Sequence, residues 1–365
     1  MNNNNYAIIM AGGVGSRFWP LSKTEQPKQF IDVLGTGKTL IQQTYARINR
    51  ICPRENILVI TNKLYENKIK EQLPNILEEN ILSEPKRRNT APCVTYGAFK
   101  IKKKNPKANI LVAPSDHVIL REDLFVEVVK KGFEFASKND ALITIGITPY
   151  KPETGYGYIH SEGNVMQENK GRWKLSKVNS FTEKPELKQA EEYLKDGQYF
   201  WNSGIFIWSA YSILEAIEKH LPILYGQFHD HINSINTPKE TAGIDAIYDV
   251  CENISIDYGV MEKADNVYVI SSDIGWSDLG SWSALQELKD ADAYGNVSNG
   301  QKALFYNSKN CLVRMHNGKV AVIDGLEDTI VVEDEKALLI CKKQDEQHIK
   351  QFVEDVEIHF GKEYV

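Results

Sequence analysis

Clustered glycines followed by two cations are the first residues whose types and spacing could do chemistry. The glycines lie in Ala11-Gly12-Gly13-Val14-Gly15-Ser16-Arg17, and the second cation lies in Gln26-Pro27-Lys28-Gln29-Phe30. Successive backbone N–H groups in such a loop form an anion-binding concavity. Arg offers a planar fork for phosphate oxygens, and Lys offers a point charge. The pattern predicts a loop that holds a polyphosphate, and an ordinary strand–helix turn is the weaker alternative.

The spacing of the glycines excludes two commoner phosphate loops. A dinucleotide fingerprint requires G-x-G-x-x-G, and the frame that starts at Gly13 has Phe18 in place of the third glycine. The segment Gly35–Thr39 is similar to the end of a Walker A loop, but Asp32 stands where that motif requires its first glycine. We therefore expect Gly35–Thr39 to form a tight turn before a helix.

An aspartate after a later apolar run is a candidate metal ligand. Ser115 and Asp116 follow Asn109–Ala113, which is predicted to be a strand. Mg²⁺ takes one or two carboxylates together with phosphate oxygens, so a carboxylate that faces a triphosphate suits this ion. The alternative is that Asp116 caps the next segment. His117 beside it is not assigned as a base.

Apolar runs and helical periodicity predict the elements that must position these residues. Aliphatic strands are expected at Tyr6–Met10, Asn56–Thr61, Asn109–Ala113, Ala141–Ile147 and Val267–Ser271. Amphipathic helices are expected at Thr39–Asn49, Tyr65–Leu73 and Cys93–Lys104, and residues 210–250 are expected to be helical. Alternation of such strands and helices indicates an α/β fold, a Rossmann-like, mostly parallel sheet with helices on both faces. Ligands of these sheets bind at the carboxyl ends of the strands, where the glycine loop lies.

The sequence resembles the sugar-1-phosphate nucleotidyltransferases over about its first 285 residues. Ala-Gly-Gly-x-Gly-x-Arg followed by Pro-Lys-Gln-Phe carries the resemblance, and the form with Phe18-Trp19-Pro20-Leu21-Ser22 is most similar to the mannose-1-phosphate guanylyltransferases. The resemblance implies an enzyme that transfers GMP from GTP to mannose 1-phosphate, giving GDP-mannose and pyrophosphate. The implied mechanism is a metal-assisted, in-line attack of the sugar phosphate on the α-phosphate, with Mg²⁺ or Mn²⁺ as the metal.

The resemblance also assigns roles to individual residues. It makes Arg17 and Lys28 catalytic and Asp116 and Asp278 metal ligands, with Asp273 as the competitor of Asp278. The implied nucleotide-binding residues are Ala11, Gly12, Gly13, Gly15, Ser16, Glu84, Asn89, Thr90 and Ser115. The implied sugar-phosphate residues are Gly157, Glu183, Lys184 and Asn202, and Ser255–Glu262 is expected to begin a helix packed against the site.

Some of these residues have a second interpretation. Glu84 and Asn89 would accept from and donate to a guanine edge, but Asn89 or Thr90 is equally suited to cap the helix that follows. The glycines and aromatic residues of 149–159 indicate a loop that meets a flat ligand face, and a plain hairpin is the alternative.

Beyond Gln286 the pattern changes to short strands separated by turns. They are expected at Ala303–Tyr306, Cys311–Met315, Val320–Ile323, Thr329–Val332 and Ala337–Cys341, followed by a helix over Glu346–Phe360. We therefore predict a catalytic domain over residues 1–285 and a small β-rich domain over residues 286–365. In the family a comparable segment forms a partial left-handed β-helix that contributes to subunit contacts, so a homodimer is expected. Longer relatives carry a phosphomannose isomerase domain here, and a single activity is expected of this chain.

Composition excludes several classes of partner. The 365 residues have a formal net charge of −6, which argues against broad attraction to nucleic acid or an anionic membrane. The sequence has no apolar run of about 18 residues and no secretory signal at its N-terminus. Its five cysteines form no C-x-x-C pair, which is typical of reduced thiols in a cytoplasmic protein.

Two rival functions stay open at this point. The nearer one is the same chemistry with another sugar 1-phosphate or another nucleoside triphosphate. The more distant one is a non-catalytic sugar-nucleotide sensor. The presence of Arg17, Lys28, Asp116 and Asp278 together argues against a sensor, since a sensor has no need of two metal carboxylates.

Overall fold

The computed structural model describes residues 2–161, 163, 165–299, 302–316 and 318–365, and it divides into two compact units. The first unit comprises the chain up to Gly12, Thr44–Ser115 and Ile119–Trp276. The second comprises Gly13–Gln43, Asp116–Val118 and Ser277–Val365. Each unit therefore contains segments that are distant in the sequence.

A mixed, mostly parallel sheet forms the centre of the first unit, with its strands in the order β3-β2-β1-β4-β11-β6-β12-β9-β8. β1 pairs in parallel with β2 and β4, β2 with β3, and β12 with β6, whereas β11 is antiparallel to β4 and β6. The strands are β1 (Asn5–Ala11), β2 (Ile57–Asn62), β3 (Ile81–Glu84), β4 (Asn109–Pro114), β6 (Leu142–Ile147), β7 (Tyr158–His160), β8 (Val165–Asn169), β9 (Trp173–Lys177), β10 (Ser180–Thr182), β11 (Tyr199–Ser209) and β12 (Val267–Ser272). The α/β fold expected from the sequence is confirmed, and the predicted strands lie within one or two residues of the observed ones.

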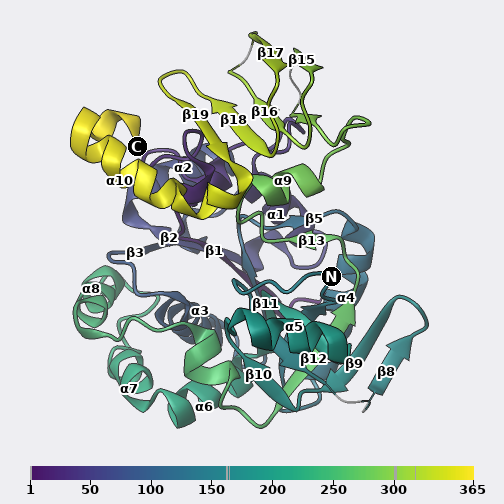
Figure 1. The fold of residues 1–365 in the computed structure, drawn as a ribbon. Helices are drawn as coiled ribbons and strands as arrows, with labels where there is room; N and C mark the ends of the chain where they lie inside the picture. The colour runs from purple at the N-terminus through teal and green to yellow at the C-terminus, as the bar shows by residue number, and fades with distance from the viewer. Residues whose placement is uncertain (1, 162, 164, 300–301, 317) are drawn as a thin grey trace. The chain divides into compact units, whose positions relative to one another are not determined.

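Helices cover both faces of this sheet. Gly97 of α3 packs so closely on Ile8 and Ile60 that an added Cβ would overlap the Ile8 side chain. On the opposite face, Gly132 of α4 packs just as closely against Ile207 of β11. The helices of the first unit are α2 (Glu66–Gln72), α3 (Thr90–Lys104), α4 (Glu122–Ala136), α5 (Leu187–Asp196), α6 (Ala210–His220), α7 (Pro222–Asp230) and α8 (Glu240–Val250), and α1 (Leu40–Ile48) begins in the second unit. Figure 1 shows α3, α6, α7 and α8 gathered on one side of the sheet.

A short helix of a different kind follows α8. Residues Asp257–Met261 form one turn of π-helix, in which the N–H of Glu262 donates to the carbonyl of Asp257 at 3.0 Å. The helix start that the resemblance implied for Ser255–Glu262 is therefore a π turn. Such turns are rare and often lie at functional sites.

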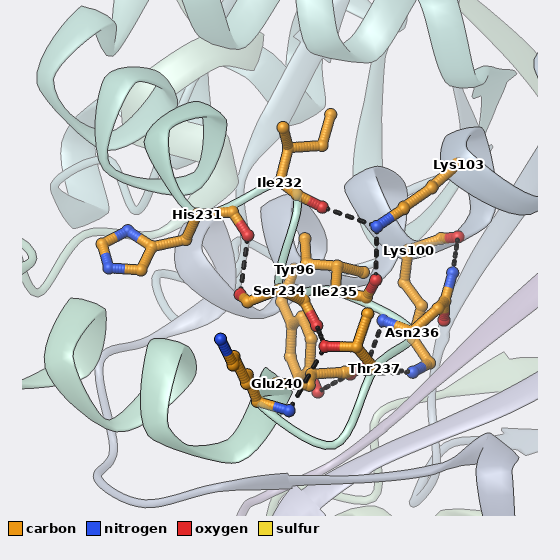
Figure 2. Close-up of polar contacts among 11 residues, drawn as sticks. Tyr96, Lys100, Lys103, His231, Ile232, Ser234, Ile235, Asn236, Thr237 and Glu240 are labelled. Carbon is orange, nitrogen blue, oxygen red and sulfur yellow. Dashed lines mark hydrogen bonds and ion pairs between the residues drawn. The ribbon is translucent and has the colours of Figure 1, made fainter.

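Side chains of α3 fix the connection between α7 and α8 (Figure 2). Lys103 Nζ donates to the carbonyls of Ile232 and Ile235, at 2.9 and 2.6 Å. Glu240, the first residue of α8, accepts from Tyr96 Oη and from Lys100 Nζ, at 2.5 and 2.7 Å. α8 is thereby anchored at its N-terminus on α3.

The second unit joins the glycine loop to the C-terminal part of the chain. Its strands are β14 (Val297–Ser298), β15 (Lys302–Tyr306), β16 (Leu312–Arg314), β17 (Val320–Asp324), β18 (Thr329–Glu333) and β19 (Leu338–Lys342), its helices are α9 (Trp282–Glu287) and α10 (Ile349–Phe360), and β5 (Val118–Ile119) and β13 (Trp276–Ser277) each have one residue in it. β14, β16 and β18 pair in parallel, and so do β15 and β17, so successive coils place one strand in each of two sheets. The five short strands and the final helix predicted here are confirmed, although α10 begins at Ile349 because residues 343–348 form a 3₁₀ turn.

One apolar core runs through the second unit. Trp282 packs on Phe18, with their ring centroids 4.6 Å apart, and its indole N–H donates to the carbonyl of Trp19 at 3.3 Å. Arg314 of β16 donates to the carbonyl of Val33 at 3.1 Å. The buried members of this core are Phe18, Trp19, Ile31, Val33, Leu40, Val118, Leu279, Trp282, Leu285, Val297, Leu312, Ile330, Val332, Leu339 and Ile349. The segment that carries Arg17 and Lys28 thus shares its core with the C-terminal strands.

Among the described residues, no helix is both long enough and apolar enough to cross a membrane.

Candidate active site

The second unit contains a cavity of about 300 Å³ that collects the predicted phosphate and metal residues. Arg17, Lys28, Asp116 and Asp278 come from three separate segments of the sequence, and all four line it. The complete lining is Gly15, Ser16, Arg17, Phe18, Lys28, Asp116, His117, Asp278, Leu279, Gly280 and Lys350. Two cations of the predicted catalytic set therefore face the same space as the two predicted metal carboxylates.

Lys28 contacts both aspartate segments that line this cavity. Its side chain is 5% exposed, and its ammonium group forms an ion pair with Asp116 Oδ2 at 2.9 Å. The same ammonium group donates to the carbonyls of Asp278 and Leu279, at 3.0 and 2.9 Å. Burial raises the pKa of Asp116, but the charges of Lys28 and His117, together with hydrogen bonds to the carboxylate, outweigh this effect and hold the pKa below its ordinary value. Asp116 is therefore ionised at neutral pH, as a metal ligand must be.

Lys28 also holds a strained turn. Leu279 has φ of 49°, in the left-handed region that non-glycine residues rarely adopt. The lysine bond to its carbonyl fixes this conformation, and the N–H of Gly280 donates to Asp278 Oδ1 at 3.0 Å. Strained residues persist where their surroundings over-determine them, often at functional sites. The backbone at Asp278 is thus bonded by the same lysine that forms the ion pair with Asp116.

Arg17 enters the cavity from a tight turn. Gly15 has φ of 74° and precedes the 3₁₀ turn Ser16–Phe18 that carries the arginine. The guanidinium donates from one terminal nitrogen to the carbonyl of Gly280 at 3.4 Å. Within the described residues, its Nε is buried and has no hydrogen-bond partner. A buried unsatisfied donor is costly, so a ligand oxygen at this position would stabilise it.

The donor set of the cavity fits a magnesium ion that is shared with substrate. Asp116 and Asp278 are two carboxylates, the number that Mg²⁺ uses when phosphate oxygens complete its coordination. Asp273, the competitor for this role, belongs to the first unit, where it forms an ion pair with Arg121 at 2.7 Å. We therefore retain Asp116 and Asp278 as the candidate ligands.

In the first unit, Glu84 lies at the end of β3 and is held by a tyrosine. Tyr248 of α8 donates to Glu84 Oε1 at 2.7 Å, and a Cβ added at Gly12 would lie 3.5 Å from Glu84 Oε2. Burial raises the pKa of Glu84 to about 7, and the bond from Tyr248 opposes this shift. The second oxygen of the carboxylate is thus presented beside the glycine that follows β1.

The remaining nucleotide residues of the first unit occupy strand ends and a helix cap. Asn89 has φ of 66° and accepts from the N–H of Thr90 at 2.9 Å, which is its capping role. Thr90 Oγ1 accepts from the N–H of Ile256 at 2.9 Å. Ala11 and Ser115 are buried just at or beyond the ends of β1 and β4. The cap expected for α3 is confirmed, and a ligand role for Asn89 and Thr90 stays a prediction.

The structure brings the predicted sugar residues together in the first unit. A Cβ added at Gly157 would overlap Glu183 Oε2 and lie 3.3 Å from Asn202 Cβ, so only glycine leaves room between them. Lys184 forms an ion pair with Glu183 Oε1 at 3.3 Å, and its side chain is 56% exposed. Burial raises the pKa of Glu183 to about 7, helped by the negative charge of Asp257 and opposed by the positive charge of Lys184.

Sequence reasoning missed four side chains that contact these residues. Tyr248 donates a hydrogen bond to Glu84, and Lys350 of α10 lines the cavity that also contains Arg17 and Lys28. Asp257 accepts from Asn202 Nδ2 at 2.7 Å, and Glu262 accepts from the N–H of Glu183 at 2.8 Å. No local pattern marks Tyr248 or Lys350, because each acts across a long sequence separation. For Asp257 and Glu262, the sequence signal was the resemblance of the segment Ser255–Glu262 to the family.

Two family models match this chain. Residues 6–294 match the family model described as nucleotidyl transferase. Residues 302–356 match the model described as MannoseP isomerase/GMP-like beta-helix domain. The two matches cover the mostly parallel sheet and the coiled C-terminal strands.

Individual proteins match over nearly the whole chain. Mannose-1-phosphate guanylyltransferase 2 of Escherichia coli O157:H7 is 38% identical over 98% of this chain and 75% of its own length. Alginate biosynthesis protein AlgA of Pseudomonas aeruginosa is 37% identical over 96% and 72%. A crystal structure from Thermus thermophilus, titled mannose-1-phosphate geranyltransferase, superposes with a TM-score of 0.84 at 29% identity, covering 97% of this chain and 99% of that one. The chain therefore belongs to the nucleotidyl transferase family and, within it, to the mannose-1-phosphate guanylyltransferases.

Proposed function

We propose that this enzyme transfers GMP from GTP to mannose 1-phosphate, giving GDP-mannose and pyrophosphate. The observation that carries the proposal is the convergence of Arg17, Lys28, Asp116 and Asp278 on one cavity of the second unit. The relatives named mannose-1-phosphate guanylyltransferase supply the identity of the two substrates.

The reaction needs no protein nucleophile. A phosphate oxygen of the sugar phosphate, already an anion, attacks the α-phosphorus of GTP in line, and the bond from that phosphorus to the bridging oxygen breaks. Pyrophosphate leaves with the electron pair, and no proton transfer is required. Catalysis then consists of positioning and of neutralising charge, as in other phosphoryl-type transfers.

The residues of the second unit would bind the triphosphate. Backbone N–H groups of Gly13, Gly15 and Ser16 would hold its oxygens, and the buried Nε of Arg17 would donate to the leaving pyrophosphate. Lys28 would keep Asp116 ionised and the turn at Asp278 in place. A divalent ion held by these two carboxylates would supply Lewis-acid polarisation of the phosphate.

The residues of the first unit would bind the base and the sugar. Glu84, oriented by Tyr248, would accept from a guanine edge, beside Ala11, Gly12, Asn89, Thr90 and Ser115 as further nucleotide-binding residues. Glu183 and Asn202 would bond sugar hydroxyls, Gly157 would let its backbone approach the sugar, and Lys184 would face the sugar phosphate. The Glu183 Oε2 atom is buried and lacks a hydrogen-bond partner among the described residues, which suits an acceptor for a hydroxyl.

We also propose a catalytic domain over residues 1–285, a β-rich domain over 286–365, a homodimer and a cytoplasmic location. The five cysteines, all within the described part of the chain, are free, which supports a reducing compartment. The homodimer rests on the family resemblance, and light scattering of the purified protein measures it.

Pyrophosphate release tests the proposed function. The assay contains Mg²⁺, GTP and mannose 1-phosphate, beside reactions with ATP, UTP or glucose 1-phosphate. We expect release largely confined to the GTP and mannose 1-phosphate pair. Release with another pair would keep the mechanism and overturn the substrates, and tight binding of nucleotide with no release from any pair would indicate a sensor.

A further inference from the structure

The hydrogen bonds around Asn202 determine which way its amide faces. Thr144 Oγ1 donates to Asn202 Oδ1 at 2.9 Å, and the N–H of Gly204 donates to the same oxygen at 3.2 Å. Asn202 Nδ2 donates to Asp257 Oδ1 at 2.7 Å. An amide oxygen has two acceptor sites and an amide nitrogen two donors. The oxygen is therefore saturated inside the protein, and one N–H is left for a ligand.

The acceptor that completes this arrangement comes from the π turn. In an α-helix, residues five apart lie about 140° apart around the axis, since each residue advances about 100°. In this π turn, by contrast, the N–H of Glu262 donates to the carbonyl of Asp257, so residues five apart are joined by a backbone hydrogen bond. The Asp257 carboxylate accepts a hydrogen bond from Asn202, and the Glu262 carboxylate accepts one from the N–H of Glu183. Both therefore contact residues that are predicted to bind the sugar.

The segment that Glu262 holds is itself strained. Lys184, the next residue after Glu183, has φ of 48°, which a non-glycine residue rarely adopts. The bond from the N–H of Glu183 to Glu262 Oε1, at 2.8 Å, ties the start of this turn to the π turn. Glu183 Oε2, on the same residue, is a buried acceptor beside Gly157.

We propose that Asp257 is a positioning residue for sugar recognition, and that the π turn Asp257–Met261 sets the hydroxyl pattern that the site accepts. The pattern is one hydroxyl that accepts from Asn202 Nδ2 and one that donates to Glu183 Oε2. This inference rests on the proposed function, because it assigns Asn202 and Glu183 to the sugar. It adds that Asp257 makes Asn202 a hydrogen-bond donor to the sugar, and that Glu262 holds Glu183 as an acceptor.

Steady-state kinetics of Asp257→Ala and Asp257→Asn test the proposal. Without an acceptor at 257, the Asn202 amide loses the bond that selects its orientation. We expect Asp257→Ala to raise the KM for mannose 1-phosphate about 10–100-fold, the scale of one buried hydrogen bond left unmade. The KM for GTP should stay within about twofold, and the preference for mannose 1-phosphate over glucose 1-phosphate should shrink. Asp257→Asn retains an acceptor oxygen and should restore most of the affinity.

Two further variants serve as a control and as a second test. Asp265→Asn removes a carboxylate that lies three residues beyond Glu262 and is 90% exposed, so it should behave as wild type. The double exchange Asn202→Asp with Asp257→Asn rebuilds the hydrogen bond with its polarity reversed, and it should fold but bind the sugar phosphate poorly. Because it removes the N–H that the proposal assigns to the sugar, wild-type affinity in this variant would overturn the proposal even where Asp257→Ala fails to fold.

Each result has one meaning. If wild type releases no pyrophosphate from any substrate pair, the proposed function fails. If wild type is active and a folded Asp257→Ala has an unchanged KM for the sugar phosphate, or equal rises in both KM values, the positioning role is overturned. Wild-type sugar affinity in the double exchange would also overturn it.

Discussion

At the scale of single residues, the candidate site depends on charges that the protein holds away from water. Arg17 has a buried Nε with no acceptor among the described residues, and Glu84 and Glu183 are carboxyl groups whose pKa values burial raises to about 7. Such groups destabilise the free enzyme, and a ligand that paired with them would offset this cost, which is the usual relation between an active site and stability.

Replacement of Arg17 by alanine should lower kcat by about 10²–10³, the scale seen when a preorganised charge-stabilising donor is lost. The reason is that negative charge builds on the leaving pyrophosphate while Arg17 is a donor with unused capacity. Single-turnover measurements with saturating GTP report the effect on the chemical step. Arg17→Lys keeps the charge but not the planar fork, and it should recover only part of the rate. An unchanged kcat in Arg17→Ala would show that our role for the loop is wrong.

Replacement of Glu84 by glutamine should stabilise the protein above pH 7 while weakening GTP binding. The pKa of Glu84 rises from 4.5 to about 7 on folding, so between these pH values the folded state binds more protons and the free energy of unfolding falls as pH rises. Glutamine removes that loss and still accepts from Tyr248. At pH 8 the gain should be on the order of 3 kcal/mol, and at pH 4.5 it should vanish.

Denaturant unfolding at the two pH values, beside GTP titration, measures both effects of Glu84→Gln. The matched control is Glu79→Gln, since Glu79 is 71% exposed. A variant that is no more stable at pH 8 than at pH 4.5, relative to wild type, would mean that Glu84 is not a buried charge in the folded protein.

At the scale of elements, the glycine loop works by backbone conformation and close packing. Gly15 combines a positive φ with contact on Lys28, where an added Cβ would lie 2.6 Å from Lys28 Cβ. Gly37 has a similar φ of 81° but has nothing within 4 Å of such a Cβ. A comparison of alanine variants at Gly15 and Gly37 therefore separates the effect of backbone strain from the effect of displacing Lys28.

Gly15→Ala should lower kcat at least about tenfold, because the methyl group pushes Lys28 from Asp116 and from the turn at Leu279. Gly37→Ala should lose about 1–2 kcal/mol of stability from left-handed strain, and Gly15→Ala should lose more, because its added Cβ also overlaps Lys28. Only Gly15→Ala should lose activity. Equal activity of the two variants in the pyrophosphate assay would argue that the position of Lys28 does not matter.

At the scale of the whole molecule, the C-terminal strands belong to the same compact unit as the glycine loop. They share the core of the second unit with Phe18 and Val33, and α10 contributes Lys350 to the lining of the phosphate cavity. The domain boundary predicted between residues 285 and 286 stays a proposal about the order of domains along the chain. Residues on both sides of that boundary line the same cavity.

Lys350→Ala should raise the KM for GTP about 3–10-fold and leave kcat nearly unchanged. Lys350 adds positive charge to the lining but is not one of the residues assigned to the reacting atoms, so the effect should be on binding and should shrink at high salt. Lys362→Ala is the control, since Lys362 lies just beyond α10 with its side chain 88% exposed. A KM for GTP that does not respond to Lys350→Ala at low salt would remove α10 from the site.

Local sequence determined much of this protein. Apolar runs and helical periodicity were sufficient for the α/β fold, for five strands of its sheet and for α1, α2 and α3, because period and hydrophobicity are local properties, whereas α4 and α5 were not predicted. Glycines beside Arg17 and Lys28 were sufficient to predict a phosphate loop for the same reason, and that role stays a prediction. Tertiary structure alone decided that Lys28 joins Asp116 to Asp278, that Tyr248 orients Glu84, and that Asp257 orients Asn202. Each of these contacts joins segments between 55 and 250 residues apart, and a hydrogen bond at that separation leaves no periodic signal in the sequence.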